Sequence, residues 1–224
     1  MESNESNVSN VSNVSNESNG SHKIEEVKES YNRLAREFNV TRVFTWNWTD
    51  NFIEKLEKNA LVLDIGCGNG RNMIYKNVKI FGLDISINQL SQKKLKDNLV
   101  CANMTNLPYK NNVFDHIICI ATFHHLPTEE SRLGSLEEIK RVLKWEGRIL
   151  LSVWSIHQPK KTKRIFSDYG DNLVPWKGKK ETIMRYYYIF KLQEIHNLLN
   201  KIFTIEKYIW DSGNEIFYLI NNKK

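Results

Sequence analysis

The chain has 224 residues, 41% of them hydrophobic, which predicts one globular domain with a single sizeable core. No apolar run approaches the length of a membrane span, and the first residues are polar where a secretory signal would be apolar. We therefore expect a cytoplasmic protein, with the nucleus as a second compartment. The formal net charge of +6 favours an anionic partner.

The first residues, 1–21, repeat a Ser-Asn-x triplet that offers almost nothing to bury, which predicts a disordered tail. From Ile24 to Phe38 the apolar residues fall at steps of three and four, the period of an amphipathic helix. A second short helix is expected around Phe52. The sequence thus predicts a single domain over 22–224 that opens with helices at 22–58.

From residue 61 onward, apolar runs rich in β-branched residues alternate with helical or loop segments. This alternation predicts an α/β fold with a mainly parallel sheet and helices on both faces. A loop rich in Lys, Arg, Gly and Pro is expected over 157–180, followed by a helix near 191–199. Two final strands joined by a tight turn at 211–214 predict a C-terminal antiparallel hairpin.

The three cysteines, Cys67, Cys101 and Cys119, each lie in an apolar segment, and none belongs to a C-x-x-C pair. This pattern argues against zinc binding or redox chemistry. We expect all three to be reduced residues of the core.

The stretch LVLDIGCGNG at 61–70 ends an apolar strand in Asp64 and continues with Gly66, Gly68 and Gly70. Glycines at the carboxyl edge of a parallel sheet let the backbone approach a nucleotide-like ligand closely. A dinucleotide fingerprint would need its third glycine where this chain has Arg71. The carboxylate of Asp64 would repel a pyrophosphate but attract a sulfonium and an amino group, which favours S-adenosylmethionine.

The next strand ends in Asp84, about 20 residues further on, where an acid can accept hydrogen bonds from both ribose hydroxyls. Two acids at adjacent strand ends support cofactor binding. A purely structural role, in which Asp64 caps a turn and Asp84 caps the helix that begins near Ser86, is compatible with binding.

With these residues, the segment 60–154 resembles the class I S-adenosylmethionine-dependent methyltransferases. The resemblance implies a Rossmann-like, seven-stranded sheet whose last strand is antiparallel. It also implies that the residues after the third strand, Asn103 and Met104, contact the adenine. The family usually has an aspartate where this chain has Asn103, whose side-chain oxygen can accept the same bond without charge.

Five flanking segments resemble the eukaryotic tRNA wobble-uridine methyltransferases, which esterify 5-carboxymethyluridine in the anticodon loop. They are YNRLAREFNVTRVFTWNW at 31–48, FHHLPTEESR at 123–132, VPW at 174–176, RYYYIF at 185–190 and DSGNEIFYLI at 211–220. The family's Gly-Asp-Arg-Ser type of turn is GLDIS here, at 82–86, without the arginine, and the basic insertion before VPW is short. The resemblance implies formation of 5-methoxycarbonylmethyluridine.

The carboxylate of such a substrate is ionised at cellular pH and can attack a methyl group without a general base. Arg42, in the Thr-Arg pair of the N-terminal motif, is expected to steer this carboxylate; a phosphate contact or a surface salt bridge is an equal alternative. His124 and His125 follow the fourth strand, where we expect one to face the pocket and the other to brace the loop.

Substrate contacts are expected from a cation with stackable rings, Arg185, Tyr186 and Tyr187, although the tyrosines could instead be core and rim of the helix that follows. The basic loop, with Lys161, Lys163 and Arg164, could follow the phosphate backbone or simply be solvated. Trp154 and Trp176 are interpreted as packing residues.

The resemblance further implies a small zinc-containing activator subunit that forms a heterodimer with the chain. An edge strand at 98–104 would be a natural docking site by strand addition. Two other functions stay open: a methyltransferase for a small metabolite or lipid precursor, and a non-catalytic RNA-binding subunit.

Overall fold

The computed structural model describes residues 8–92, 98–162, 165–179 and 181–223. Its helices are α1 (Val8–Asn39), α2 (Asn47–Ile53), α3 (Ile87–Leu90), α4 (Glu129–Val142) and α5 (Leu192–Ile202), with a short 3-10 helix η1 (Phe123–His125). Its strands are β1 (Leu61–Ile65), β2 (Lys79–Asp84), β3 (Leu99–Cys101), β4 (Phe114–Ile120), β5 (Leu143–Trp154), β6 (Gly170–Lys177), β7 (Thr182–Ile189), β8 (Thr204–Asp211) and β9 (Asn214–Ile220).

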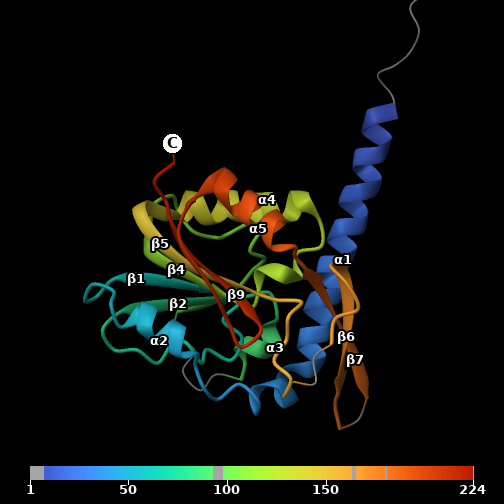
Figure 1. The fold of residues 1–224 in the computed structure, drawn as a ribbon, viewed down its shortest axis with the longest axis horizontal. Helices are drawn as coiled ribbons and strands as arrows, with labels where there is room; N and C mark the ends of the chain where they lie inside the picture. The colour runs from blue at the N-terminus through green and yellow to red at the C-terminus, as the bar shows by residue number, and fades with distance from the viewer. Residues whose placement is uncertain (1–7, 93–97, 163–164, 180, 224) are drawn as a thin grey trace, which may run out of the picture.

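Seven strands form one sheet in the order β3-β2-β1-β4-β5-β9-β8 (Figure 1). Every neighbouring pair from β3 to β5 is parallel, whereas β9 is antiparallel to both β5 and β8. The predicted α/β class and the predicted C-terminal hairpin are therefore confirmed. The order reverses between β1 and β4, which places the carboxyl ends of these strands at a switch point where open sheets bind ligands.

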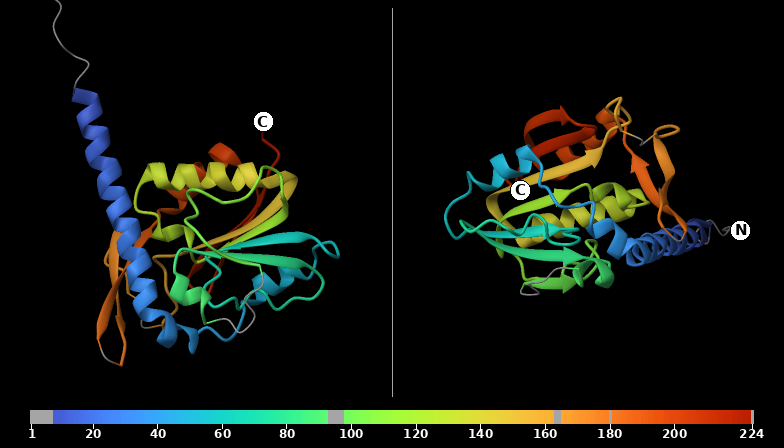
Figure 2. Two further views of the ribbon diagram at one scale, coloured as in Figure 1. Left: turned by 180° about the vertical axis from the view of Figure 1, so that it is seen from behind. Right: turned by 90° about the horizontal axis from the view of Figure 1, so that it is seen from below.

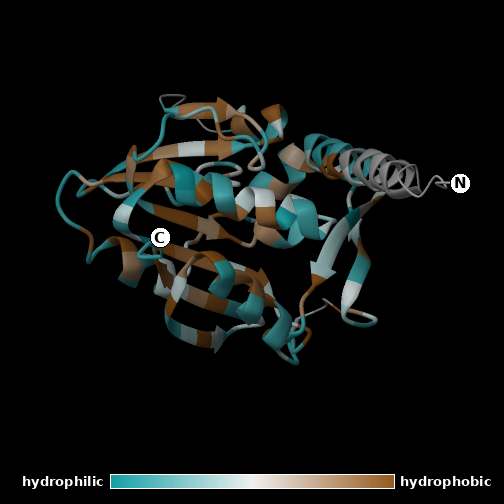
Figure 3. Ribbon diagram, turned by 90° about the horizontal axis from the view of Figure 1, so that it is seen from above, coloured by the Kyte–Doolittle hydropathy of each residue, from teal (hydrophilic) through white to brown (hydrophobic). Residues whose placement is uncertain are grey.

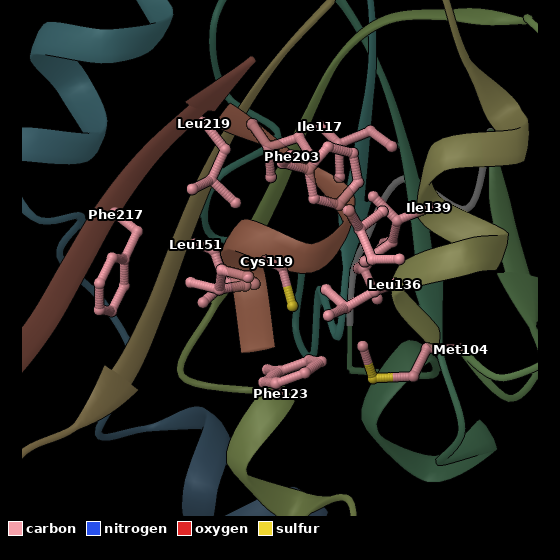
Figure 4. Packing of buried hydrophobic residues seen from close by; sticks show 14 of the residues in the cluster. Met104, Ile117, Cys119, Phe123, Leu136, Ile139, Leu151, Phe203, Phe217 and Leu219 are labelled. Carbon is pink, nitrogen blue, oxygen red and sulfur yellow. The ribbon is translucent and has the colours of Figure 1, made fainter. Parts of the chain in front are cut away.

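Alternating side chains of the central strands face opposite sides of the sheet, as the period of two requires. On one side, Leu63 and Ile117 pack against α4 and α5 in the larger core. Figure 4 shows Leu136 and Ile139 of α4 beside Cys119 of the sheet. The opposite side carries Val62 and packs against α2. The sheet is thus covered by helices on both faces, and its strands hold most of the strongly hydrophobic positions (Figure 3).

A second sheet consists of β6 and β7, which pair antiparallel in a hairpin. Part of the predicted basic loop, over 170–177, is therefore a strand, and the predicted loop at 157–180 is wrong in that part. Cross-strand pairing with β7 buries Val174 and Tyr187 on one face, which short-range sequence reasoning could not detect.

Helix α1 runs along this hairpin and along α3 (Figures 1 and 2). The hydroxyl of Ser30 donates to the carbonyl of Met184 on β7 (3.1 Å), and Lys23 pairs with Asp171 (2.9 Å). On the α3 side, the hydroxyl of Ser86 donates to Asn32 Oδ1 (2.7 Å). The first helix therefore closes one wall of the space between the two sheets.

The predicted disordered tail differs from the structure, because α1 begins at Val8 and residues 8–21 are helical. Residues 1–7 lie outside the described part. The repeat contains no proline, and extending a helix that is already anchored costs far less than nucleating a new one. The low content of apolar residues, which suggested disorder, does not prevent this extension.

The cysteine prediction holds for Cys67 and Cys119, which are buried, but not for Cys101, which is exposed. Cys101 ends the three-residue edge strand β3, where only one neighbouring strand covers the backbone. Among the described residues, no helix is long and apolar enough to cross a membrane, and no group of three or more His, Cys, Asp or Glu side chains could hold a metal ion.

Candidate active site

A cavity of about 1140 Å³ lies between the carboxyl edge of the large sheet, α1 and the β6–β7 hairpin. One half is lined by the glycine loop after β1, by the end of β2 and by the loop after β3. The other half is lined by α1, η1 and β7, with Arg42, His125 and Arg185 among its residues. The tertiary fold therefore brings the two predicted groups of site residues to one space.

The glycine loop needs its glycines for two reasons. Gly66 and Gly68 line the cavity and have φ angles of 74° and 56°, in the region that side chains disfavour. A Cβ atom on Gly66 would lie only 2.7 Å from the Cβ of Thr122. Gly70 also has a positive φ, of 74°, but it does not line the cavity. Its N–H donates to the Cys67 carbonyl (2.9 Å), so its role is to close the turn.

Asp84 ends β2 and lines the cavity, as predicted for a ribose ligand. One carboxylate oxygen accepts the Gly68 N–H (2.8 Å) and the other accepts the Ser86 N–H (2.8 Å). Burial raises the pKa of Asp84 to about 6, against the opposing effect of these hydrogen bonds. Each oxygen keeps acceptor capacity for one further donor.

Asp64 lies deeper than the sequence predicts. It is 1% exposed, does not line the cavity, and accepts a long hydrogen bond from Asn72 Nδ2 (3.4 Å). The physical reason is that β1 continues to Ile65, so Asp64 shares the sheet face of Val62 beneath the loop. A direct contact of Asp64 with a ligand in this cavity is therefore not supported by the structure.

The loop after β3 places Asn103 and Met104 in the wall of the cavity. Asn103 Oδ1 accepts the Thr105 N–H (3.1 Å), which orients the side chain. Met104 is buried in the larger core and packs with the group shown in Figure 4. Both lie where the sequence predicts the base of a nucleotide.

The two histidines differ in environment. His124 is fully buried, its Nδ1 accepts the Trp154 N–H (3.0 Å), and it does not line the cavity. It braces η1 against β5, so the prediction of a catalytic role for His124 is not supported. His125 lines the cavity, and this matches the expectation that one histidine of the pair faces the pocket.

His125 is held in one tautomer by its partners. Its Nδ1 lies 2.7 Å from the carbonyl oxygen of Tyr186, which can only accept, so Nδ1 carries the proton. Burial lowers the pKa of His125 to about 3, and the ring is neutral at pH 7. Its Nε2 therefore accepts the hydroxyl hydrogen of Tyr31 (2.9 Å).

A directed chain of hydrogen bonds follows from this tautomer. The Tyr31 oxygen, having donated to His125, accepts from the Tyr187 hydroxyl (3.1 Å), and Tyr187 accepts from Arg185 Nη1 (2.6 Å). The chain joins β7, α1 and η1 across one wall of the cavity. In this arrangement the Nε2 lone pair of His125 is already engaged by Tyr31.

The three residues Arg185, Tyr186 and Tyr187 lie on strand β7, not at the edge of a helix. Arg185 and Tyr187 line the cavity, whereas Tyr186 does not. The Tyr186 hydroxyl donates to Asp171 (2.7 Å) in the hairpin. Of these three residues predicted to contact the substrate, Arg185 and Tyr187 are therefore the two that lie at the cavity.

Arg42 lies at the wall of the cavity with its guanidinium 4.1 Å from the centre of the Phe38 ring. Its Nη1 donates to the hydroxyl of Thr41 (3.1 Å). Burial lowers the pKa of Arg42, and the nearby charge of Arg185 lowers it further. None of the ion pairs among the described residues includes Arg42, so the surface salt bridge considered for it is absent from this part of the chain.

Comparison with known proteins identifies the family. A family model described as "Methyltransferase domain" matches residues 63–151. The Encephalitozoon cuniculi protein named "Putative methyltransferase ECU09_1500" is 32% identical over 77% of this chain and 83% of that protein. The chain belongs to the methyltransferase family.

Other relatives of this methyltransferase carry more specific names. A Schizosaccharomyces pombe "tRNA (carboxymethyluridine(34)-5-O)-methyltransferase" is 29% identical over 78% of this chain and 86% of that protein. A longer Xenopus tropicalis relative with the same enzyme name is 34% identical over 62% of this chain but only 23% of its own length.

Among solved structures, a chain described as "Complex between the Haloferax volcanii Trm112 methyltransferase activator and the putative methyltransferase" has a TM-score of 0.63 at 16% identity. The match covers 88% of the present chain and 98% of that chain. At this identity the likeness shows the fold alone.

Several cavity residues of the methyltransferase were not predicted from the sequence. Arg71 was noted only because it replaces a fingerprint glycine, yet it lines the cavity. Trp154 and Trp176 were interpreted as packing residues; Trp154 does pack in a buried cluster with Tyr187, and both tryptophans also line the cavity. Tyr31 was noted only as a helix position. The signal for Tyr31 was its place at the start of a family-like segment, and the signal for Trp176 was the VPW segment that it ends.

In the basic loop, Lys161 is exposed, as a phosphate contact would require. Lys163 and Arg164 lie outside the described residues. Lys177 and Thr162 of the same region line the cavity, so the loop reaches its edge.

Proposed function

We propose that this chain is an S-adenosylmethionine-dependent tRNA methyltransferase that esterifies 5-carboxymethyluridine at the wobble position to 5-methoxycarbonylmethyluridine. The observation that carries the proposal is a cavity with a glycine loop and Asp84 in one half and, in the other, Arg42 and Arg185, which form no ion pair with a described residue. The name of the fission-yeast relative, which aligns over most of both chains, supports the same reaction.

The residues of the first half fit S-adenosylmethionine. Asp84 offers two oxygens for the ribose hydroxyls, and Asn103 with Met104 lies where the adenine would bind. Gly66 and Gly68 leave bare backbone in the wall of the cavity, and the nearest described atom to a Cβ placed on Gly68 would be Gln89 Oε1 at 3.9 Å. When bound, the cofactor would supply an electrophilic methyl group.

The second half fits an acceptor that needs no base. A carboxymethyl group has a pKa near ~4 and is ionised at cellular pH, so its oxygen is already a nucleophile. A neutral His125 whose lone pair is engaged agrees with this requirement, because it cannot remove a proton. The residues of this half would act by positioning the acceptor and excluding water.

For the tRNA itself we propose contacts from the exposed lysines near the cavity, Lys161, Lys177 and Lys179, and from Lys163 and Arg164 of the same loop. Cations along one rim suit a phosphate backbone. Phe44, which lines the cavity and is 84% exposed, offers a ring on which an unpaired base could stack.

We further propose a heterodimer with a small zinc-containing activator subunit that docks on the edge strand β3. In the described part of the chain β3 pairs only with β2, so its outer backbone groups are available for strand addition. The Haloferax volcanii complex, which contains a methyltransferase activator, supports a partner of this kind.

The decisive experiment is nucleoside mass spectrometry of tRNA that carries 5-carboxymethyluridine. The tRNA is incubated with S-adenosylmethionine and the chain, with and without the activator subunit. We expect 5-methoxycarbonylmethyluridine to appear only with the activator. Binding of S-adenosylmethionine without change in any tRNA nucleoside would contradict the proposal and would favour a small carboxylate or hydroxyl acceptor.

Replacing His125 with alanine should lower turnover at least tenfold while changing the affinity for S-adenosylhomocysteine less than threefold. The reason is that both ring nitrogens of His125 are used to link α1 to β7 in the acceptor half. Tyr31→Phe, which removes the same link from the other side, should show the same split between turnover and affinity. Equal losses in both quantities would show a general folding defect instead.

A further inference from the structure

Arg185 is a buried cation without a counter-ion in the described part of the chain. It is 4% exposed and belongs to none of the ion pairs found there. Its single hydrogen bond to a described residue runs from Nη1 to the hydroxyl of Tyr187 (2.6 Å), and its buried Nε has no acceptor. Burying a guanidinium that lacks a counter-ion and hydrogen-bond acceptors costs folding free energy, unless a bound ligand supplies a negative charge and accepts its N–H groups.

The surroundings of Arg185 are aromatic and not acidic. Its guanidinium carbon lies 5.2 Å from the ring centres of Trp176 and Tyr187 and 5.9 Å from that of Trp154. Trp176 adds a second donor without an acceptor, because its buried Nε1 has no partner among the described residues. Both orphan donors belong to residues that line the cavity.

The hydrogen-bond chain fixes the orientation of Arg185. Nη1 of Arg185 donates to the Tyr187 hydroxyl. The Tyr187 hydroxyl donates to Tyr31, and Tyr31 donates to His125. Among the described residues nothing accepts from Nε or Nη2, and this edge can donate two parallel hydrogen bonds to a carboxylate that reaches the buried Nε.

The charge balance of the cavity points the same way. The described residues of its wall include four cations, Arg42, Arg71, Lys177 and Arg185, against one carboxylate, Asp84, which belongs to the cofactor half. The acceptor half therefore presents an excess of positive charge to its ligand, in a partly desolvated space where each charge acts strongly.

We propose that Arg185, together with the indole N–H of Trp176, binds the carboxylate of the methyl acceptor and makes the enzyme select an acid over its neutral amide. This inference rests on the proposed function and names the specificity-determining residues of that site. A carboxylate has about four lone-pair directions, so the two N–H groups of Arg185 and the indole N–H of Trp176 can occupy three of them while one lone pair stays free to attack.

The assignment has a consequence for turnover. Esterification converts the anionic carboxylate to a neutral methyl ester, which forms weaker hydrogen bonds with a guanidinium. The methyl-ester product therefore binds the acceptor half less tightly than the carboxylate substrate does, because methylation weakens its hydrogen bonds with Arg185. The site would reject the amide for the same reason.

The test measures equilibrium binding of three otherwise identical tRNAs, with 5-carboxymethyluridine, 5-carbamoylmethyluridine or uridine at the wobble position. The protein is the complex of the full chain and its activator, saturated with S-adenosylhomocysteine so that no turnover occurs. We expect the wild type to prefer the acid over the amide by about tenfold or more, the worth of one charge-assisted pair. Arg185→Met should reduce this preference to about twofold, and Arg185→Lys should give an intermediate value.

Arg148→Met serves as the matched control, because Arg148 pairs with Glu206 at the far edge of the sheet. It should leave the preference unchanged. Trp176→Phe keeps an aromatic ring but removes the N–H, and it should lower the preference severalfold even if Arg185→Met fails to fold.

Two outcomes would overturn the inference while leaving the proposed function intact. One is full acid preference in both Arg185→Lys and Trp176→Phe. The other is an equal loss of affinity for all three tRNAs in Arg185→Met, which would assign Arg185 to a phosphate. If the wild-type complex does not methylate the carboxymethyl tRNA in the mass-spectrometric assay, the proposed function fails and this inference fails with it.

Discussion

Gly66→Ala is expected to destabilise the chain by about 2–4 kcal/mol and to abolish binding of S-adenosylhomocysteine. The new Cβ would lie 2.7 Å from the Thr122 Cβ and closer still to its hydroxyl, at a φ of 74° that alanine disfavours. Either the glycine loop or the loop after β4 must move, and both line the cavity. Thermal unfolding and calorimetric titration measure the two effects.

Gly134→Ala is the control for this substitution. Gly134 lies inside α4, and apart from the backbone of this helix and the adjacent residues no described atom lies within 4 Å of the position that an added Cβ would take. Alanine should therefore be neutral or stabilise the helix by up to ~1 kcal/mol. Thr122→Gly combined with Gly66→Ala should restore part of the lost stability, because it removes the atoms in collision. A Gly66→Ala protein with wild-type melting temperature and affinity would contradict the described loop.

Asp84→Ala should weaken binding of S-adenosylhomocysteine by at least a hundredfold. Two hydrogen bonds from ribose hydroxyls to a carboxylate contribute about 3 kcal/mol or more together, which corresponds to that factor. In the wild-type chain the N–H groups of Gly68 and Ser86 donate to Asp84, and the substitution removes this acceptor from both. Asp84→Asn keeps one acceptor oxygen and should lose less affinity. An unchanged affinity in Asp84→Ala would place the ribose elsewhere.

The same carboxyl predicts a pH dependence of cofactor binding. The pKa of Asp84 is about 6, and ribose hydroxyls donate to its ionised form, so affinity should be constant above pH 7 and fall as pH drops through 6. At pH 5, one unit below the pKa, the dissociation constant should rise about tenfold. In Asp84→Asn this step should vanish. A step that persists in that variant would belong to another group.

Local patterns in the sequence were sufficient to predict the large sheet and its C-terminal hairpin. The run of apolar strand segments predicted the mainly parallel sheet, and the DSGN turn predicted the final hairpin, because turn chemistry and strand periodicity act between near neighbours in the chain. The glycines and Asp84 were predicted as site residues for the same reason. Each lies at or just after the end of a predicted strand, and the carboxyl ends of parallel strands are where such sheets bind ligands.

The acceptor half was decided by the tertiary structure. Tyr31, His125 and the pair Trp176 and Arg185 come from three distant segments, and only the packing of α1 and the β6–β7 hairpin on the large sheet joins them. Strand pairing turned part of the predicted loop into β6, and it set which side chains of β7 face the cavity. The sequence alone determined the fold and the cofactor-binding edge of the sheet. Which arginine lacks a counter-ion among the described residues was decided by burial and by long-range contacts. Burial and long-range contacts both depend on neighbours that are remote along the chain.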